Sequence, residues 1–594
     1  MASLSPRQRE AVAHDGHLLI VAGPGSGKTT TTVAKAARTL KNPARSLVMV
    51  TFTKDAAEEM RKRLVAALTR AEVRQPDESR LVVATFHSIA IRHLKRNGMR
   101  LKVLSPQQQD MIYRDAAMSA DVDRDAWGDV QKEFERVMYA VAPDSVDVAP
   151  ITQRVVARYR DLLRATGQTD LYTVMRDCAI GAHEGTLPPL PFTDMFVDEG
   201  QDTDDLQRLW IFAHARVGVR VTIVGDDDQS VYEWRNALGY EGMRSFLETF
   251  NAHRIELGEN YRCRSEILTP AANLIQCNQR RLGKTLVAER GRGGTVAAFR
   301  TASPQNQAEA LAEIIQAAPD KHSNAAILAR TNRSLDLVEI MLRGNGVPYA
   351  RVGRSIWEQP VIAGYVGLLQ TLLTGSPPGL LPVLQLRNVS DQVRSDLLHS
   401  LRGNVGSFLD GEVPTLNSMD RADAETLGDL AKAFAYWRGQ LRGAAGGAAG
   451  SVREVILEVG ELYARWSRGE HAKNLLDLCS RILSDLKGPL SGRINLVTRK
   501  ERDHSQARLV LMTMHGAKGL EFETVHIVDA NDTDDGSAVV RPEAERRLMY
   551  VAMTRAKNCC LVWVSGRPHP SVAEAQLVYK RTRDELVQLV RASA

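Results

Sequence analysis

Short runs of apolar residues alternate along the chain with longer segments in which apolar residues recur every three or four positions. The runs at 17–22, 46–51 and 80–85 are each followed by a segment of the second kind, such as 54–68. The runs predict buried strands, and the longer spacing predicts amphipathic helices. Strands that alternate with helices build a parallel sheet, and such sheets bind ligands at the carboxyl ends of their strands.

This alternation stops between residues 91 and 190, where the pattern is mostly helical, and stops again between 375 and 502. The second stretch contains the flexible "RGAAGGAAG" at 442–450. Further strand patterns occur at 194–199, 220–226, 325–330, 508–513, 524–530 and 559–564. We therefore predict an α/β protein of four parts, in which two parallel sheets are each interrupted by a helical insertion.

Composition narrows the class of protein. A chain of 594 residues is too long for one core, and 44% apolar and 25% charged residues are ordinary for a globular protein. No run of about 18 apolar residues occurs and residues 1–10 lack the apolar core of a signal peptide, so we expect a cytoplasmic protein with no membrane association. The six cysteines form no C-x-x-C pair, which disfavours a disulfide framework or a zinc module. The net charge of +6 permits a nucleic-acid partner.

A phosphate-binding loop is predicted where the first strand meets the first long helix. Its sequence, "AGPGSGKTT", has the flanks that a P-loop requires. Lys28 can neutralise the β- and γ-phosphate oxygens, and the Thr29 hydroxyl can ligate Mg²⁺. The residues that would surround an ATP phosphate chain are Ala22, Gly23, Pro24, Gly25, Ser26, Gly27, Lys28, Thr29 and Thr30.

Acidic residues follow two other predicted strands. In "MFVDEGQD", Asp198 suits a Mg²⁺ ligand, and Glu199 can orient or deprotonate the attacking water. In "IVGDDDQSVYEWR", Gln229 could reach the γ-phosphate or the water. The three acids at 226–228 fit either a second shell around the metal or a polar loop, and the residues alone leave both interpretations open.

These motifs, with others in the same order, make the chain resemble the UvrD/Rep/PcrA-type superfamily 1A DNA helicases. Beyond the P-loop and the acid boxes, "SPRQREAV" resembles the family's Q motif, and "ENYR" and "MTRAK" its two arginine motifs. The other strings that carry the resemblance are "VTFTKDAAEEMRKRL", "ATFHSIA", "AAILARTN" and "VLMTMHGAKGLEFETVHI".

The resemblance implies two RecA-like motor domains, called 1A and 2A, with helical insertions 1B and 2B. The implied boundaries are 1–90 and 191–256 for 1A, 91–190 for 1B, 257–374 and 503–594 for 2A, and 375–502 for 2B.

The resemblance also assigns roles around ATP. It implies that Gln8 reads the adenine, that Tyr261 stacks on it and that Glu521 binds the ribose. Arg262 and Arg555 match the two arginines that reach the γ-phosphate, and ATP binding between the two sheets would draw them together.

On the DNA side, Trp234 matches the aromatic residue on which a base stacks, with Tyr232 beside it and His515 as a neighbouring contact. Gln229 would sense the phosphate while Trp234, five residues on, holds the strand, so one loop would link ATP state to grip on DNA. The remaining matched DNA-side residues are Phe52, Thr53, His87, Arg235, Arg330 and Asn332.

The implied function is that of an ATP- and Mg²⁺-dependent motor that moves 3′ to 5′ on single-stranded DNA and unwinds duplexes in repair, replication or plasmid and defence DNA processing. Single strands and single-strand/duplex junctions are the expected partners, with a loading protein or a nuclease as a further partner, and the expected state is a monomer or weak dimer. Two alternatives stay open: a translocase or protein-stripping motor that needs a partner to unwind, and a DNA-independent P-loop ATPase switch.

The chain departs from the family pattern at three places. Gly200 replaces the usual Phe, which predicts extra backbone freedom beside the acids and looser coupling. Glu233 and Asn236 stand where glycines are usual. The second insertion is short, and its "LRNVSDQ" only faintly resembles the family's duplex-contacting turn. About 40 residues follow Arg555 without an acidic nuclease constellation, which disfavours a fused helicase–nuclease.

Overall fold

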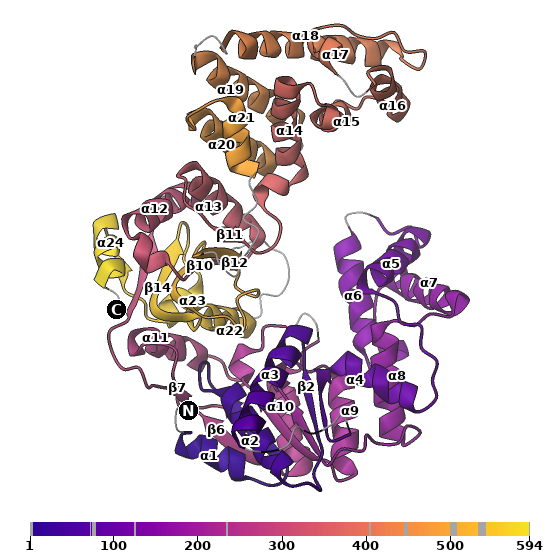
Figure 1. Cartoon of the computed structure of the whole chain (residues 1–594), viewed down its shortest axis with the longest axis vertical. Helices are drawn as coiled ribbons and strands as arrows, with labels where there is room; N and C mark the ends of the chain where they lie inside the picture. Colours follow the sequence, from indigo (N-terminus) through magenta and orange to yellow (C-terminus); the bar gives the residue numbers. More distant parts are fainter. Residues whose placement is uncertain are drawn as a thin grey trace. The chain divides into compact units, whose positions relative to one another are not determined.

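The computed structural model describes residues 4–592 except 72, 74–75, 77–78, 124–125, 233–235, 403–404, 445–448, 468, 499–507 and 533–541. The chain forms two compact units (Figure 1). Unit 1 comprises residues 1–293 and 537–554, and unit 2 comprises residues 294–536 and 555–594. Each unit contains one large parallel sheet with helices packed on it.

The sheet of unit 1 has six parallel strands in the order β3-β2-β4-β5-β1-β6. The strands are β1 (Leu18–Ala22), β2 (Leu47–Thr51), β3 (Leu81–Thr85), β4 (Asp194–Val197), β5 (Arg220–Gly225) and β6 (His253–Leu257). Every residue of β1 to β4 is buried, which is why these strands read as continuous apolar runs in the sequence. The predicted strands at 17–22, 46–51 and 80–85 are confirmed.

Helices cover both faces of this sheet. On one face, α2 (Lys28–Lys41) and α3 (Lys54–Arg70) pack against alternate strand residues such as Leu47 and Met49. On the other face, α4 (Phe86–Arg96), α9 (Asp205–Arg216) and α10 (Gly239–Phe250) share one core with Val48 and Val50. The period of two along β2 therefore divides its side chains between two separate cores.

The segment between β3 and β4 is helical, as predicted. It forms α5 (Pro106–Ser119), α6 (Trp127–Tyr139), α7 (Pro150–Thr166) and α8 (Leu171–Glu184). Phe134 lies at the centre of a core of its own, with its ring 4.8 Å from that of Tyr113 and 4.9 Å from that of Tyr159.

The sheet of unit 2 has seven parallel strands in the order β11-β12-β10-β13-β14-β9-β15. They are β9 (Thr295–Arg300), β10 (Ala325–Ala329), β11 (Ala350–Arg351), β12 (Leu509–Thr513), β13 (Phe522–Ile527), β14 (Ala556–Val564) and β15 (Tyr579–Lys580). The helices α12 (Pro304–Ala317), α13 (Asn332–Gly344), α23 (Pro570–Glu574) and α24 (Arg583–Ala592) belong to the same unit. The fold class, two parallel motor sheets with helical insertions, is thereby confirmed.

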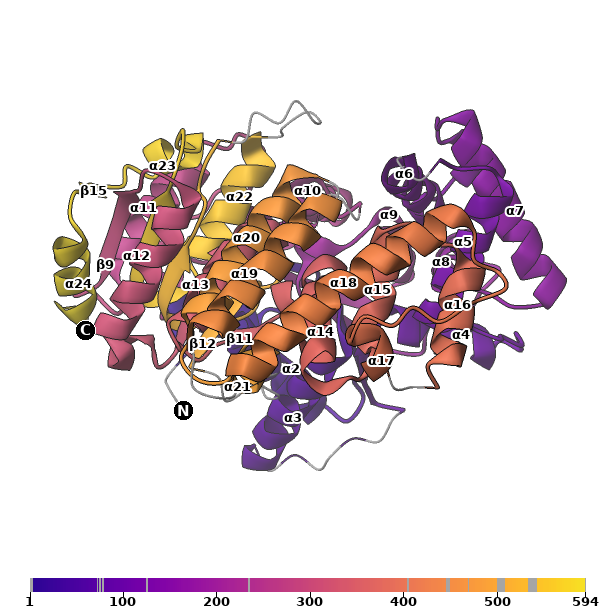
Figure 2. The ribbon, with the colours of Figure 1, turned by 90° about the horizontal axis from the view of Figure 1, so that it is seen from above.

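The rest of unit 2 is helical. It comprises α14 (Pro360–Thr374), α15 (Leu380–Leu386), α16 (Asp391–Ser400), α17 (Gly406–Leu409), α18 (Arg421–Ala444), α19 (Ala449–Trp466), α20 (Glu470–Asp485) and α21 (Leu490–Thr498). Helices α18, α19 and α20 lie side by side (Figure 2). A Cβ atom on Gly460 of α19 would lie only 2.6 Å from Cβ of Ser480 on α20, so this glycine permits the close approach of the two helices.

Unit 1 also contains two helices that lie far apart in the sequence but pack together. Helix α11 (Ser265–Gln276) and helix α22 (Pro542–Met553) lie in unit 1, with the short strands β7 (Glu259–Asn260) and β8 (Val287–Ala288). The Asn278 amide donates to the Glu543 carbonyl at 3.0 Å, which ties the two helical segments together. The four-part division of the chain stays a prediction, and the two units do not follow its boundary after residue 256.

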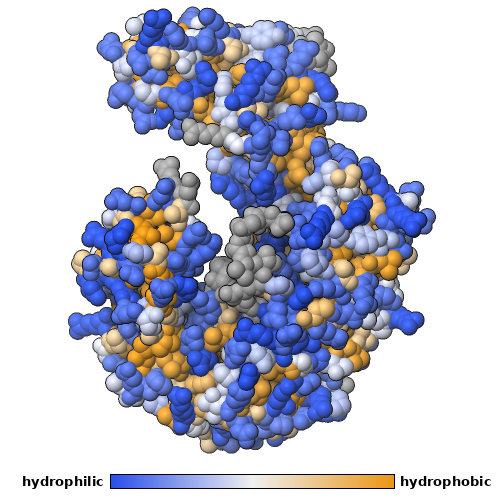
Figure 3. All heavy atoms as spheres, turned by 180° about the vertical axis from the view of Figure 1, so that it is seen from behind, coloured by the Kyte–Doolittle hydropathy of each residue, from blue (hydrophilic) through white to orange (hydrophobic). Residues whose placement is uncertain are grey.

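No helix within the described ranges is long and apolar enough to cross a membrane. On the face shown in Figure 3, hydrophilic side chains cover most of the surface and apolar ones form smaller separate areas.

His214 of α9 is buried in unit 1 as a neutral ring. Its Nδ1–H donates to the Trp210 carbonyl at 2.8 Å, and its Nε2 accepts the Leu190 N–H at 3.1 Å. Both ring nitrogens are thus satisfied in the neutral form, and burial lowers the pKa of His214 to about 4.

Acidification is expected to destabilise the protein through His214. Its pKa in the fold, about 4, lies below the ordinary value of 6.5, so the unfolded chain binds the additional proton between these values. The free energy of unfolding should therefore fall as pH drops from about 6.5 towards 4, by at most about 1.4 kcal/mol per pH unit. Urea unfolding of wild type and His214→Gln at pH 7 and pH 5 measures this, with the exposed His399→Gln as control. An undiminished pH dependence in His214→Gln would contradict the expectation.

Candidate nucleotide and nucleic-acid site

The P-loop has the backbone that its glycines predict. It connects β1 to α2, and Gly25 and Gly27 have φ values of 61° and 77°, which residues with a Cβ rarely adopt. Space is equally limiting, since a Cβ on Gly25 would lie 2.6 Å from Cβ of Arg262. The loop therefore exposes backbone N–H groups at the N-terminus of α2, an arrangement that binds phosphate.

Gln8 holds this loop from the N-terminal side. Its side chain is buried, and its Nε2 donates to the Ser26 carbonyl at 3.0 Å. Its Oε1 accepts the Ser5 N–H at 2.9 Å in the capping box of α1 (Pro6–Ala13). In this structure Gln8 therefore braces the loop backbone, and its contact with adenine stays a prediction.

The two acids of the first acid box follow β4. Glu199 Oε2 lies 3.0 Å from Nζ of Lys28 and accepts the Gln201 amide at 2.6 Å. Burial alone would lower the pKa of Lys28, but the carboxylates of Glu199, Asp226 and Asp198 outweigh it and raise the pKa. Glu199 also has φ 50° and ψ 44°, a left-handed conformation that costs energy for a residue other than glycine and is typical of functional sites.

Asp198 fits a metal ligand. One of its carboxylate oxygens is buried without a hydrogen-bond partner among the described residues. Burial, and then the neighbouring Glu199 carboxylate, raise the pKa of Asp198 to about 7. A buried carboxylate oxygen with no donor suits a hard cation such as Mg²⁺, and Thr29 in the first turn of α2 offers a hydroxyl oxygen of the kind that Mg²⁺ accepts.

Gly200 is packed rather than loose. It is buried, its carbonyl accepts the Thr203 hydroxyl at 2.8 Å, and a Cβ on it would lie 2.2 Å from Cγ2 of Ile223 in β5. The sequence predicted additional backbone freedom here. The structure shows instead that the absence of a side chain lets the Ile223 methyl group lie directly against the acid box.

Gly200→Ala is expected to lower the free energy of unfolding by about 1–3 kcal/mol, because the new methyl group would overpack against Ile223. Adding Ile223→Leu, which removes the γ2 methyl, should recover part of this loss, so the two changes would not be additive. Urea unfolding of both single variants and the double variant measures the coupling. Gly128→Ala is the control, since nothing lies within 4 Å of a Cβ there. Additive effects would show that the contact with Ile223 is not the cause.

The second acid box leads from β5 into the sensor loop, which we define as residues 226–229. The Asp226 N–H donates to Oε1 of Gln201 at 2.9 Å, and the Gln229 amide donates to the Asp226 carboxylate. Gln201 thus contacts Glu199 through its nitrogen and Asp226 through its oxygen. This fully buried amide joins the two acid boxes.

Asn260 connects the predicted adenine and arginine residues to the P-loop. Its Nδ2 donates to the Pro24 carbonyl at 2.5 Å, and its Oδ1 accepts the Arg262 N–H at 2.9 Å. The Tyr261 N–H donates to the Gly25 carbonyl at 3.0 Å, and the Tyr261 side chain is 46% exposed, as a ring that stacks on a ligand must be. The Arg262 guanidinium donates to the Thr554 carbonyl at 3.3 Å.

Arg555 and Glu521 lie close together in unit 2. The buried Arg555 guanidinium donates to the Leu520 carbonyl at 3.2 Å, and its own carbonyl accepts the Phe522 N–H at 2.9 Å. The half-exposed Glu521 pairs with Lys557 at 2.9 Å.

The predicted DNA-side residues follow the carboxyl ends of strands in their own unit. In unit 1, Phe52 and Thr53 follow β2, His87 follows β3, and Tyr232 follows β5. In unit 2, Arg330 and Asn332 follow β10, and His515 follows β12. Strands β2 and β3 are neighbours, as are β10 and β12, so each unit gathers these residues at one sheet edge. Trp234 and Arg235 lie outside the described residues. Asn236 has a φ of 60°, which is in the left-handed region. Asparagine adopts this conformation more readily than most other residues that could take the place of glycine.

Two sequence profiles match the chain. Residues 4–158 and 191–251 match the UvrD/REP helicase N-terminal domain, and residues 255–357 and 461–565 match the UvrD-like helicase C-terminal domain. Together they cover more than two thirds of the chain. The chain belongs to the UvrD/Rep helicase family. It is therefore an enzyme of the ATP-dependent DNA helicase class, and the resemblance drawn from its motifs is confirmed.

Curated relatives agree with this assignment over nearly the whole length. DNA helicase II of Escherichia coli (strain K12) is 28% identical over 626 residues, which span 93% of this chain and 83% of the relative. UvrD1, an ATP-dependent DNA helicase of Mycobacterium tuberculosis (strain ATCC 25618 / H37Rv), is 28% identical over 649 residues, spanning 93% and 81%. PcrA, an ATP-dependent DNA helicase of Leuconostoc citreum, is 26% identical over 620 residues, spanning 93% and 80%.

Three longer segments of this UvrD/Rep helicase lie outside the two matched profiles. They are residues 159–190, 358–460 and 566–594. The first contains α8, the second runs from α14 to most of α19, and the third contains α23, β15 and α24. Both motor sheets, by contrast, are matched almost throughout.

Sequence reasoning did not identify four residues that contact the P-loop or the two acid boxes in this UvrD/Rep helicase. They are Gln201, Asn260, Arg281 and Lys284. Gln201 is part of "DEGQD", so its position beside the acids was a usable signal. Lys284 follows the polar stretch "RRLG" and has no periodic or motif context that would distinguish it from a solvated lysine.

Proposed function

We propose that this helicase hydrolyses ATP to move 3′ to 5′ along single-stranded DNA and to separate the duplex ahead of it. One observation carries the proposal: an unbroken series of contacts links the P-loop to the sensor loop that precedes Trp234. Lys28 bonds to Glu199, and the Gln201 amide bonds both to Glu199 and to the backbone of Asp226. The direction of movement comes from the family resemblance.

In this proposal Lys28 neutralises the terminal phosphates of ATP, and Glu199 orients the attacking water. Mg²⁺, when bound, would neutralise charge on the β- and γ-phosphate oxygens, with Thr29 and Asp198 as its ligands from this chain. Arg262 and Arg555 stabilise the charge that develops on the transferred phosphoryl group. Gln229 reports the presence of the γ-phosphate to the loop beyond it.

On the nucleic-acid side, we assign base stacking to Trp234 with Tyr232 beside it. Stacking on an aromatic ring contributes about 1–3 kcal/mol per base and tolerates any sequence, which suits a motor. The further proposed contacts are Phe52, Thr53, His87, Arg235, Arg330, Asn332 and His515. The proposed setting is cytoplasmic DNA repair, replication or plasmid and defence DNA processing by a monomer or weak dimer, acting at single-strand/duplex junctions.

A second candidate is a translocase that strips proteins from single strands and unwinds only with a loading protein or nuclease. The divergence of residues 358–460 from the family profile favours it, because this segment includes much of the proposed 2B insertion. The third candidate, an ATPase switch that needs no DNA, leaves the polar and aromatic residues at the two sheet edges without a role.

ATP turnover with and without single-stranded DNA, measured beside strand displacement on 3′-tailed and 5′-tailed duplexes, tests these candidates. Stimulation with unwinding from the 3′ tail alone is the expected result. Stimulation without unwinding would favour the partner-dependent translocase. Turnover that ignores DNA would overturn the motor proposal and leave the ATPase switch.

A further inference from the structure

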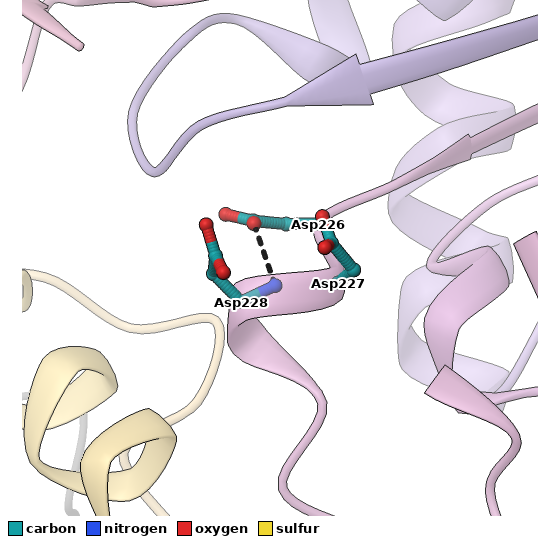
Figure 4. Close-up of side chains that lie close together, drawn as sticks. All are labelled: Asp226, Asp227 and Asp228. Atoms are coloured by element: carbon teal, nitrogen blue, oxygen red, sulfur yellow. Dashed lines mark hydrogen bonds between the residues drawn. The ribbon is translucent and has the colours of Figure 1, made fainter. Parts of the chain in front are cut away.

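Lys284 is buried beneath the sensor loop. It lies in the segment between α11 and β8, and its side chain is fully buried. Its Nζ lies 2.7 Å from Asp226, 3.2 Å from Asp227 and 2.6 Å from Asp228. Figure 4 shows how the three carboxylates gather around the turn that opens the loop, where the Asp228 N–H also donates to Asp226 at 3.2 Å.

Charge makes this arrangement obligatory. Three carboxylates within 4.8 Å of one another and out of contact with water repel strongly unless cations lie among them. Lys284 and Arg281 are cations that lie among these carboxylates. The Arg281 guanidinium donates to both Asp228 oxygens, at 3.0 and 2.7 Å. The position of the acids, and with them the course of the sensor loop, is therefore set by the segment 281–284.

From Lys284 the contacts run without a gap to the P-loop. Lys284 bonds to Asp226, whose carboxylate also accepts the Gln229 amide. The backbone of Asp226 bonds through Gln201 to Glu199, and Glu199 bonds to Lys28. A displacement of the Lys284 ammonium would therefore reach the residues proposed to orient water.

The same segment is fastened on its other side to α22. The backbone N–H of Gln279 donates to the Glu543 carboxylate at 2.8 Å, and Arg547 donates to the Arg280 carbonyl at 3.3 Å. Helix α22 ends at Met553, next to Thr554, whose carbonyl accepts from Arg262. The segment 278–284 thus contacts both the sensor loop and α22, the helix that leads to the second arginine motif, and α22 also contacts residues 227–229 directly.

We propose that Lys284 is a positioning residue that fixes the sensor loop against α22, so that Gln229 and Glu199 are held in register for ATP hydrolysis. This inference rests on the proposed function and adds to it a residue outside the motifs. Lys284 acts through the carboxylates and touches neither nucleotide nor DNA. Its removal should lower kcat and leave ATP binding intact.

The test compares Lys284→Met/Asp227→Asn with Asp227→Asn alone. In wild type, three carboxylates face two cations, and in the double variant two carboxylates face one cation. The net charge of the buried cluster is therefore the same in both proteins, so the double variant should still fold. The amide oxygen introduced by Asp227→Asn can still accept the Leu282 N–H that the Asp227 carboxylate accepts at 2.6 Å. The two variants therefore differ only in the Lys284 ammonium.

We expect the double variant to lose about 10–100-fold in kcat relative to Asp227→Asn, measured with and without single-stranded DNA, the size of loss that small misplacements cause. KM for ATP and the affinity for a fluorescent ATP analogue should change by less than about threefold. Melting temperatures verify that each variant is folded.

A double variant with the kcat of Asp227→Asn would overturn the inference, as would a parallel loss of nucleotide binding and melting temperature, which indicates a merely structural role. If DNA does not stimulate ATP turnover by the wild type, the motor proposal fails. The positioning role is then tested by kcat without DNA, which should show the same loss in the double variant.

Discussion

Arg262→Ala is expected to lower kcat for ATP hydrolysis by roughly 10³–10⁵-fold, the range measured for arginines that stabilise phosphoryl transfer in other NTPases. The structure supports this magnitude by position. Cβ of Arg262 lies against the P-loop at Gly25, and Asn260 ties the Arg262 backbone to the carbonyl of Pro24. In the proposed role, the Arg262 guanidinium acts on charge that develops only during phosphoryl transfer, so ATP should still bind.

Arg264→Ala is the matched control, because it removes the same group two residues further on. Its guanidinium donates to the Arg290 and Arg292 carbonyls and has no contact with the P-loop among the described residues. Single-turnover hydrolysis together with equilibrium binding of an ATP analogue separates chemistry from affinity. Equal losses in the two variants would remove the catalytic role of Arg262.

Lys28→Ala should be the next most damaging change, with kcat lower by at least about 10²–10³-fold, the loss that follows removal of one group stabilising transition-state charge. Nζ of Lys28 lies 3.0 Å from Glu199, so the substitution also releases the carboxylate proposed to orient water. Unlike Arg262→Ala, it should weaken ATP binding as well, because Lys28 is proposed to neutralise the phosphates of bound ATP.

Lys35→Ala on the same helix controls for the loss of a buried lysine. Its ammonium donates to the carbonyls of Ala11 and His14, at the end of α1 and away from the P-loop. Steady-state ATP turnover of both variants, with melting temperatures beside it, gives the comparison. A Lys28→Ala protein with normal turnover would refute the assignment of the P-loop.

Gly200, which stands where the family usually has Phe, shows how the surrounding fold fills the space of a missing side chain. From the sequence, a missing side chain beside the two acids of the first acid box predicts a less rigid backbone. In the fold, the volume is taken by the Ile223 methyl group from the neighbouring strand β5. Gly200 and Ile223 pack directly against each other. For this reason the non-additivity of the two substitutions in the free energy of unfolding, and not either effect alone, measures their contact.

The sequence by itself determined the strands, the helices that cover them and the chemistry at the strand ends. These features are local: a buried strand such as β2 is apolar throughout, an amphipathic helix such as α3 repeats every three to four residues, and the P-loop needs glycines at fixed offsets. Because the motifs are short and follow one another in a fixed order, they were also sufficient to indicate the family.

Only the tertiary structure decided which distant residues complete the site. Gln201 joins the two acid boxes, and Lys284 contacts acids more than fifty positions earlier in the sequence. Helices α11 and α22 pack together in unit 1 although they lie far apart in the sequence. Such contacts have no local signal, because a buried lysine among carboxylates and a solvated one have the same flanking sequence. The energy that distinguishes them is the repulsion of three carboxylates shielded from water, and that repulsion arises only once the fold has brought them together.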